Sequence, residues 1–86
     1  MTYQVRIERA AGKAFDALPN AIKQRVAVAI DRLADNPRHI GVIKLTGTDN
    51  GYRVRVGRYR VIFAIDDEVA RVSIVRIAIR QEAYRP

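Results

Sequence analysis

The sequence contains no cysteine and a single histidine, His39, among its 86 residues. Without thiols the chain can form no disulfide and no thiolate metal site, and a zinc site would have to rest on carboxylates. The five glycines form neither a phosphate-binding Walker loop nor a dinucleotide-binding turn. We therefore expect a protein that uses no metal and no other cofactor, and we expect His39 to be a solvated loop residue.

Long apolar runs are also missing. No stretch approaches the roughly 18 apolar residues that a membrane-spanning helix requires, and the run from Met1 to Arg6 lacks the apolar core of a signal peptide. There is no low-complexity segment, and the 49% of residues that are hydrophobic can support one core. These features predict one folded domain over residues 1–86 that is cytoplasmic and has no membrane partner.

Acidic residues are few, because nine Asp and Glu stand against sixteen Lys and Arg and leave a net charge of +7. Thirteen of the sixteen basic residues are arginine, whose planar guanidinium matches phosphate oxygens and stacks on bases. A coding sequence rich in guanine and cytosine would also enrich arginine, but everywhere in the chain. The placement of the arginines therefore says more than their number about a nucleic-acid partner.

The hydrophobic pattern predicts two helices set between strands. Asn20 is suited to cap the second helix, and Asn36–Pro37 is suited to end it. The expected elements are a strand at 3–7, a helix at about 9–18, a helix at 20–36, a loop at 38–51, and strands at 52–56, 59–65 and 69–79. This order, β-α-α-β-β-β, predicts an α+β fold in which a helical hairpin packs on one face of a mainly antiparallel four-stranded sheet. The other face is left open.

Three arginines are expected to cluster on that open face. If Gly57–Arg58 is a two-residue hairpin turn, Arg55 lies opposite Arg60 and Arg53 lies one step further along the same face. Like charges placed opposite each other are destabilising, so the pattern indicates a bound anion such as a phosphodiester. The alternative is that polar residues simply alternate outward on a half-solvated sheet. That explains the alternation but not the exclusive use of arginine.

The C-terminal run ends in an arginine and an aromatic residue. Arg80 closes the last predicted strand and reaches the arginine cluster only if that strand contains a bulge or has already ended. Tyr84 is suited to stack on an unstacked base, or to cover the edge of the sheet.

Few kinds of catalysis are open to this composition. A histidine and a carboxylate acting as acid and base are excluded by the isolation of His39, and the carboxylates at 66–68 are typical of a solvated turn. Arginines can stabilise the transition state at a phosphate while the 2′-hydroxyl of an RNA attacks it. Because arginine is a poor general base, such an enzyme would depend on a partner that orients the RNA.

Three segments resemble the RelE family of toxins: Lys44–Gly47, Tyr52–Phe63 and Arg80–Tyr84. The strand and two helices at the start resemble the family as well, so the likeness runs over nearly the whole chain. It implies a RelE-like fold and the toxin of a type II toxin–antitoxin system. Such a toxin cleaves mRNA in the ribosomal A site with the 2′-hydroxyl as nucleophile, inhibits translation, and is neutralised by a cognate antitoxin. Promoter DNA would be contacted only indirectly, through the antitoxin.

The resemblance also assigns roles to individual residues. Arg53 and Arg55 stand where RelE-type toxins often have lysines, one of which is proposed to move a proton at the 2′-hydroxyl. Arg60 matches the arginine at the scissile phosphate, Arg80 the one near the leaving group, and Tyr84 the tyrosine that positions the nucleotide. Three further basic residues are expected to bind RNA without catalysing the reaction: Lys44, Arg58 and Arg85.

Two other functions remain compatible with the sequence. ParE-type toxins share the fold and inhibit DNA gyrase, so the fold alone does not decide the activity. A degenerate toxin that binds only its antitoxin and DNA is the third alternative, because both lysine positions hold arginine. The basic hairpin and the terminal arginine and tyrosine favour the ribosomal nuclease.

Overall fold

Seven elements follow one another in residues 2–79, the part of the chain that this computed structural model describes. They are β1 (Gln4–Ile7), α1 (Arg9–Asp16), α2 (Asn20–Asp35), β2 (Val42–Lys44), β3 (Gly51–Val56), β4 (Tyr59–Asp66) and β5 (Arg71–Ile79). The five strands form one sheet in the order β1-β5-β4-β3-β2. Only β1 and β5 pair in parallel, and the other neighbours are antiparallel.

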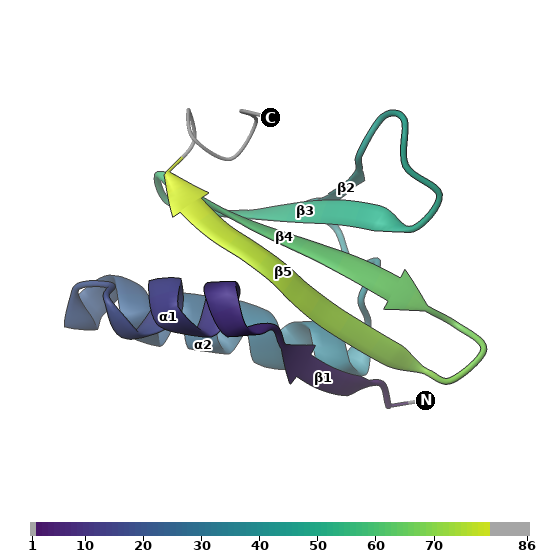
Figure 1. The fold of residues 1–86 in the computed structure, drawn as a ribbon, viewed down its shortest axis with the longest axis horizontal. Helices are drawn as coiled ribbons and strands as arrows, with labels where there is room; N and C mark the ends of the chain where they lie inside the picture. The colour runs from purple at the N-terminus through teal and green to yellow at the C-terminus, as the bar shows by residue number, and fades with distance from the viewer. Residues whose placement is uncertain (1, 80–86) are drawn as a thin grey trace.

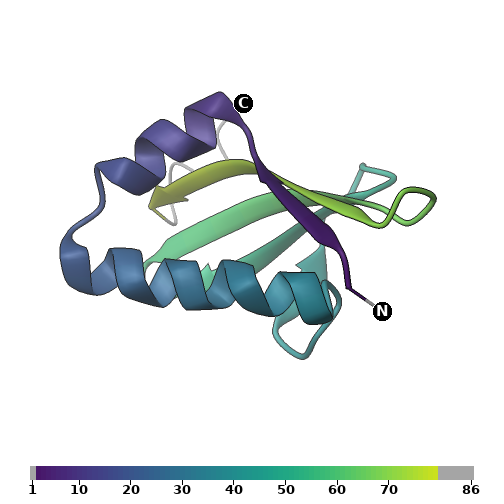
Figure 2. The same ribbon diagram turned by 90° about the horizontal axis from the view of Figure 1, so that it is seen from below.

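The two helices lie together on one face of this sheet (Figures 1 and 2). The apolar stripe predicted for α2 is confirmed, because Val26, Ile30 and Leu33 are buried and Ile22 and Ala29 pack against them. The core between the layers consists of thirteen buried residues: Ala11, Leu18, Val26, Ile30, Leu33, Val54, Val56, Val61, Phe63, Ile65, Val72, Ile74 and Ile77. The predicted α+β class, with helices on one face, is therefore correct. No helix within residues 2–79 is long and apolar enough to cross a membrane.

Two helix boundaries differ from the prediction. Asn20 does not cap α2 but is its first residue, and Pro19 occupies the N-cap position without a side-chain cap. The reason is that the carbonyl of Pro19 already accepts the backbone N–H of Lys23 at 2.8 Å, which defines the cap. The first helix ends at Asp16 rather than at Leu18. The predicted end of α2 at Asn36 is confirmed.

The sheet has five strands and not four, because residues 42–44 form a strand where a loop was expected. The strand β2 pairs with β3 through Val42 opposite Val54 and Lys44 opposite Tyr52. Three residues are too few to show the alternation that marks a strand in a sequence. What makes this segment a strand is the edge of β3, whose backbone groups would otherwise lack protein partners.

The last hairpin also differs in its boundaries. Asp66 belongs to β4, where it pairs with Arg71, and β5 begins at Arg71 rather than at Val69. The turn between them ends at Ala70, whose φ of 51° lies in the left-handed region. A β-branched residue at Val69 favours a strand locally, but the pairing of Asp66 with Arg71 fixes the turn at residues 67–70.

Asp67 in this turn ties together three separate parts of the chain. It accepts hydrogen bonds from both terminal nitrogens of Arg38, at 3.0 and 2.9 Å, and from the hydroxyl of Tyr3 at 2.7 Å. The guanidinium of Arg38 also lies 5.3 Å from the centre of the Tyr52 ring. These hydrogen bonds lower the pKa of Asp67 to about 2, and the bond from Arg38 has a larger effect than the bond from Tyr3.

This carboxylate predicts a pH-dependent difference in stability between the wild type and Asp67→Asn. Because the pKa of Asp67 is lower in the folded chain than its ordinary value of 3.8, the contribution is fully present above that value and is lost as the pH falls through about 2. Urea unfolding should give a lower midpoint for the variant at pH 7 and a much smaller difference near pH 2. An equal gap at both pH values would contradict the assigned role of the Asp67 charge.

Candidate functional site

The predicted register of the arginine hairpin is confirmed. Arg55 lies opposite Arg60 and Arg53 lies opposite Ile62, with Val56 and Tyr59 flanking the turn. Gly57 has a φ of 59°, as a hairpin turn with glycine in its first central position requires. The hairpin therefore places three guanidinium-bearing residues on the face of the sheet that points away from the helices.

The expectation that all three are open to solvent is wrong for Arg60. Arg55 is exposed and Arg53 is half-buried, but Arg60 retains only 4% of its exposure. Arg60 belongs to β4, which has β3 on one side and β5 on the other, whereas β3 has only the short β2 as its outer neighbour. Arg60 is thus a charged group held inside the fold rather than a surface residue.

The arginines line a pocket of about 490 Å³ at the edge of the sheet. Three lining arginines come from the hairpin and a fourth, Arg32, comes from α2. The connection from α2 to β2 also lines the pocket. The lining residues are Arg32, His39, Ile40, Gly41, Ile43, Arg53, Val54, Arg55 and Arg60. Four of these lining residues are arginines and none is a carboxylate, so the lining is rich in positive charge. Such a pocket favours a ligand with several negatively charged oxygens.

A β-bulge in β5 brings a further arginine onto the same face. Ile62 pairs with Arg76 while the next residue, Phe63, pairs with Ile74, so Val75 is the extra residue. The bulge reverses the alternation, so that Ile77 is buried and Arg76 lies across β4 from Arg53. On the sequence pattern, Arg80 reaches the arginine cluster only if the strand contains a bulge or has already ended. Arg80 itself lies outside the described residues, as do Tyr84 and Arg85.

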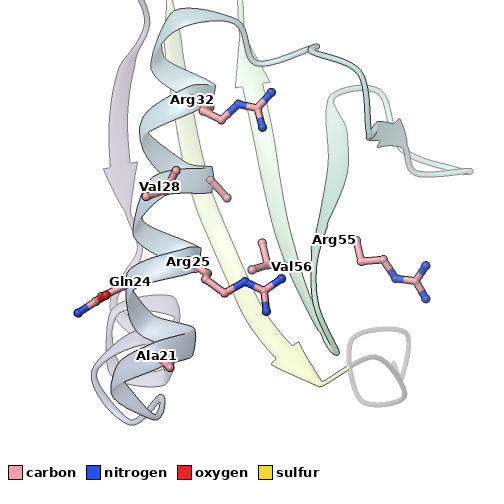
Figure 3. A pocket seen from close by; sticks show the side chains of 8 residues that line it. Ala21, Gln24, Arg25, Val28, Arg32, Arg55 and Val56 are labelled. Atoms are coloured by element: carbon pink, nitrogen blue, oxygen red, sulfur yellow. The ribbon is translucent and has the colours of Figure 1, made fainter.

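A second pocket, of about 520 Å³, lies between α2 and β3 and adjoins the first. Figure 3 shows Arg25 and Arg32 reaching from α2 toward β3, whereas Arg55 points away from the helix. Arg32 and Arg55 line both pockets. The remaining lining residues of the second pocket are Ala21, Gln24, Arg25, Val28, Ala29 and Val56. It is therefore an apolar groove with arginines along its rim.

Comparison with known proteins identifies the family to which this chain belongs. A family model described as the ParE toxin of the type II toxin–antitoxin system parDE matches residues 5–84. The chain belongs to the RelE/ParE superfamily of toxins. The match includes the arginine hairpin and most of the sheet.

Individual relatives identify the chain as a toxin of the RelE type. Toxin RelE of Mycobacterium tuberculosis is 34% identical over 84 residues, which covers 96% of this chain and 87% of the relative. The crystal structure of the archaeal RelE–RelB complex from Pyrococcus horikoshii matches at 35% identity with a TM-score of 0.81, covering 93% of this chain and 97% of that one. The toxin–antitoxin complex RelBE2 from Mycobacterium tuberculosis matches at 29% identity with a TM-score of 0.80, covering 93% of this chain and 100% of that one.

Two of the predicted RNA-binding residues of this RelE-type toxin lie apart from the pocket. Lys44 is exposed and pairs with Tyr52, so it belongs to the face of the sheet opposite to that of Arg53. Arg58 is exposed in the turn that follows Gly57, at the tip of the hairpin. Neither residue lines the arginine pocket.

His39 is not the solvated loop residue that the sequence predicted. The side chain is half-buried and lines the arginine pocket, and its Nδ1 lies 2.7 Å from the carbonyl oxygen of Ile40. The backbone of His39 is held as well, because its N–H donates to Asn36 and its carbonyl accepts from Val42. The pocket therefore contains an ordered imidazole as well as arginine side chains.

Sequence reasoning missed three residues of the site in this toxin: Arg32, His39 and Arg76. Arg32 lies seven positions after Arg25 on α2, a spacing that indicates a shared helix face but not a pocket. Arg76 was detectable, because the adjacent apolar pair Ile74–Val75 breaks the alternation as a bulge does. His39 gave no signal, since its position depends on β2 lying beside β3.

Proposed function

We propose that this toxin is a ribosome-dependent endoribonuclease that cleaves mRNA in the A site and so inhibits translation. The observation that carries the proposal is the pocket of four arginines, Arg32, Arg53, Arg55 and Arg60, without a carboxylate in its lining. A phosphodiester in transition to a pentacovalent state gains negative charge on its oxygens, and preorganised cations stabilise that charge. The likeness to RelE toxins supports the same substrate class.

The reaction would proceed through the RNA's own 2′-hydroxyl. The 2′-oxygen attacks the adjacent phosphorus, and the bond from phosphorus to the 5′-oxygen of the next nucleotide breaks. Arg60, buried at the back of the pocket, would hold the scissile phosphate, with Arg53 and Arg55 at its other oxygens. By family resemblance Arg80 would stabilise the leaving 5′-oxygen and Tyr84 would stack on a base. No metal ion or organic cofactor takes part in the proposed step.

The ribosome would supply the geometry that the toxin lacks. In-line attack requires the 2′-oxygen, the phosphorus and the 5′-oxygen to be nearly collinear, and orientation of this kind is worth several orders of magnitude in rate. A codon held in the A site is already constrained along its backbone. The exposed cations outside the pocket, Lys44 and Arg58 together with Arg85, would then bind nearby RNA and set the toxin's orientation. This activity belongs in the cytoplasm.

We further propose that a cognate antitoxin neutralises the toxin by occupying the groove between α2 and β3. The structural relatives from Pyrococcus horikoshii and Mycobacterium tuberculosis are complexes with RelB antitoxins or named toxin–antitoxin complexes. The groove has an apolar floor, including Val28 at 60% exposure, and its rim carries Arg25, Arg32 and Arg55. These features fit an amphipathic segment with acidic residues along its sides. Contact with promoter DNA would be made through the antitoxin.

Reversing the charge of the rim should weaken this complex. We expect Arg25→Glu combined with Val28→Glu to raise the Kd for the cognate antitoxin by about tenfold or more, since each change opposes an acidic, apolar partner. Calorimetric titration of the purified variant measures the change. Arg6→Glu, an exposed charge reversal on β1 outside both pockets, should bind normally. An unchanged Kd for the double variant would place the antitoxin elsewhere.

Gyrase inhibition is the main rival, because the family model that matches this chain is described as a ParE toxin. Regulated expression in bacteria discriminates between the alternatives. The proposed nuclease should stop growth with cleavage of mRNA and without a DNA-damage response, and co-expressed antitoxin should restore growth. A DNA-damage response without mRNA cleavage would identify a gyrase inhibitor, and normal growth would identify a degenerate toxin.

A further inference from the structure

We infer that His39 is the general base of the cleavage reaction, accepting the proton of the attacking 2′-hydroxyl at its Nε2. This inference rests on the proposed nuclease function and supplies the step that an arginine cluster leaves open. A guanidinium has no lone pair to accept a proton, so none of the four arginines that line the pocket can act as the base. Among the described side chains that line the pocket, the imidazole of His39 is the one with a basic nitrogen.

The hydrogen bond at Nδ1 determines which nitrogen can act. Nδ1 lies 2.7 Å from the carbonyl oxygen of Ile40, and a carbonyl oxygen only accepts, so Nδ1 carries a hydrogen and donates it. In the neutral ring the lone pair is therefore on Nε2. A carbonyl partner that fixes the tautomer and orientation of an imidazole is the arrangement that catalytic histidines use.

Nε2 of His39 has no hydrogen-bond donor among the described residues, as expected of a base whose donor is the substrate. Nε2 is buried, and it accepts no hydrogen bond from any of residues 2–79. A buried acceptor without a donor is unfavourable, so a hydroxyl group that enters the pocket and donates to Nε2 removes this cost while the Nδ1 bond to Ile40 is kept. Such tightening on substrate binding is common, because catalytic hydrogen bonds are often incomplete before the substrate arrives.

The position of His39 relative to the arginines fits the chemistry. The same pocket is lined by Arg53 and Arg55 of β3, by Arg60 of β4 and by Arg32 of α2, so a phosphate held by these cations lies in the space that His39 borders. The ribose that carries the attacking hydroxyl is covalently attached to that phosphate through its 3′-oxygen. A phosphate bound by these arginines would therefore place that ribose in or beside the pocket that His39 lines.

The step balances without a further reactant. Nε2 takes the proton of the 2′-hydroxyl as the bond between the 2′-oxygen and phosphorus forms, and the bond from phosphorus to the 5′-oxygen breaks. The 5′-oxygen takes a proton from solvent, and the imidazolium later returns its proton to water. The products are a 2′,3′-cyclic phosphate and a 5′-hydroxyl end. Negative charge on the pentacovalent phosphate offsets the positive charge that His39 gains beside the four arginines.

The test is single-turnover cleavage of an mRNA on programmed ribosomes by wild type, His39→Asn and His39→Ala. Asparagine retains an amide that can donate to the Ile40 carbonyl but has no basic nitrogen, so it separates catalysis from local structure. Loss of a general base should slow cleavage by about 100-fold or more in both variants. Added imidazole should restore part of the rate to His39→Ala and none to Arg60→Gln. Val69→Ala, in the turn after β4, serves as the control that cleaves normally.

A second substrate separates the base from the acid. If sulfur replaces the bridging 5′-oxygen, the leaving group needs no proton, so a variant that lacks only the general acid regains its rate. We expect His39→Asn to stay slow on this substrate. Full-rate cleavage by His39→Asn on the normal RNA, or its rescue by sulfur, would overturn the inference while leaving the nuclease function intact. If the wild type itself fails to cleave, the proposed function fails and this inference with it.

Discussion

Replacing Arg53 and Arg55 together with alanine is expected to reduce ribosome-dependent cleavage by about 10³-fold or more. Each guanidinium stabilises charge that develops on the phosphate oxygens, and loss of one such donor typically costs about 10²–10³-fold in rate. The two effects should not multiply in full, because the effects of residues that act on the same phosphate are not additive. Single-turnover cleavage with saturating toxin measures the chemical step directly.

The same substitution should leave the fold intact or make it more stable. Arg55 lies directly opposite Arg60, and like charges in that position are destabilising by up to about 1 kcal/mol. Thermal unfolding should therefore show a Tm equal to that of the wild type or a few degrees higher. The matched control is Arg6→Ala with Arg9→Ala, which removes the same charge from exposed positions outside the pocket. Equal loss of cleavage in this control would attribute the effect to net charge.

Replacing Phe63 with alanine is expected to lower the free energy of unfolding by about 3–5 kcal/mol. Phe63 is completely buried at the centre of β4, and its ring stacks on Tyr52 of β3 with centroids 5.9 Å apart. The loss is large beside the total stability of a small domain, about 5–15 kcal/mol. The site would suffer too, because this contact joins the two strands that carry Arg53, Arg55 and Arg60.

Urea unfolding followed by circular dichroism measures this loss. In thermal unfolding, the Tm should fall by roughly 12 °C or more, because each kcal/mol lowers the Tm of a domain of this size by about 4–8 °C. Val69→Ala removes a smaller apolar group from a position that is 56% exposed, and it should change stability by less than about 0.5 kcal/mol. A small effect of Phe63→Ala would mean that the core repacks around the cavity.

The parts of the fold that the sequence predicted are those that depend on local chemistry. Gly57 and the alternation on both sides of it set the turn and the register, so the pairing of Arg55 with Arg60 followed from a few neighbouring residues. The apolar stripe of α2 likewise repeats within the helix itself and identifies its buried side. In both cases the information lies within about ten residues.

The parts that the sequence did not predict depend on contacts between distant segments. The strand β2 exists because β3 offers an edge, and this pairing brings His39 into a pocket whose arginines lie on β3, β4 and α2. The burial of Arg60 likewise depends on its central strand and not on its own neighbours in sequence. Periodicity assigns a residue to a face of the sheet, but it does not show what covers that face.

The most direct test of the proposed function is to map mRNA 5′ ends by primer extension in a purified translation system. The reactions compare wild-type toxin, Arg60→Gln toxin and wild-type toxin without ribosomes, with the Arg6→Ala, Arg9→Ala variant as the folded control. We predict cuts within A-site codons that require both the ribosome and Arg60, and that the control variant reproduces. Folded wild-type toxin that produces no cuts on translating ribosomes would contradict the account and direct attention to gyrase.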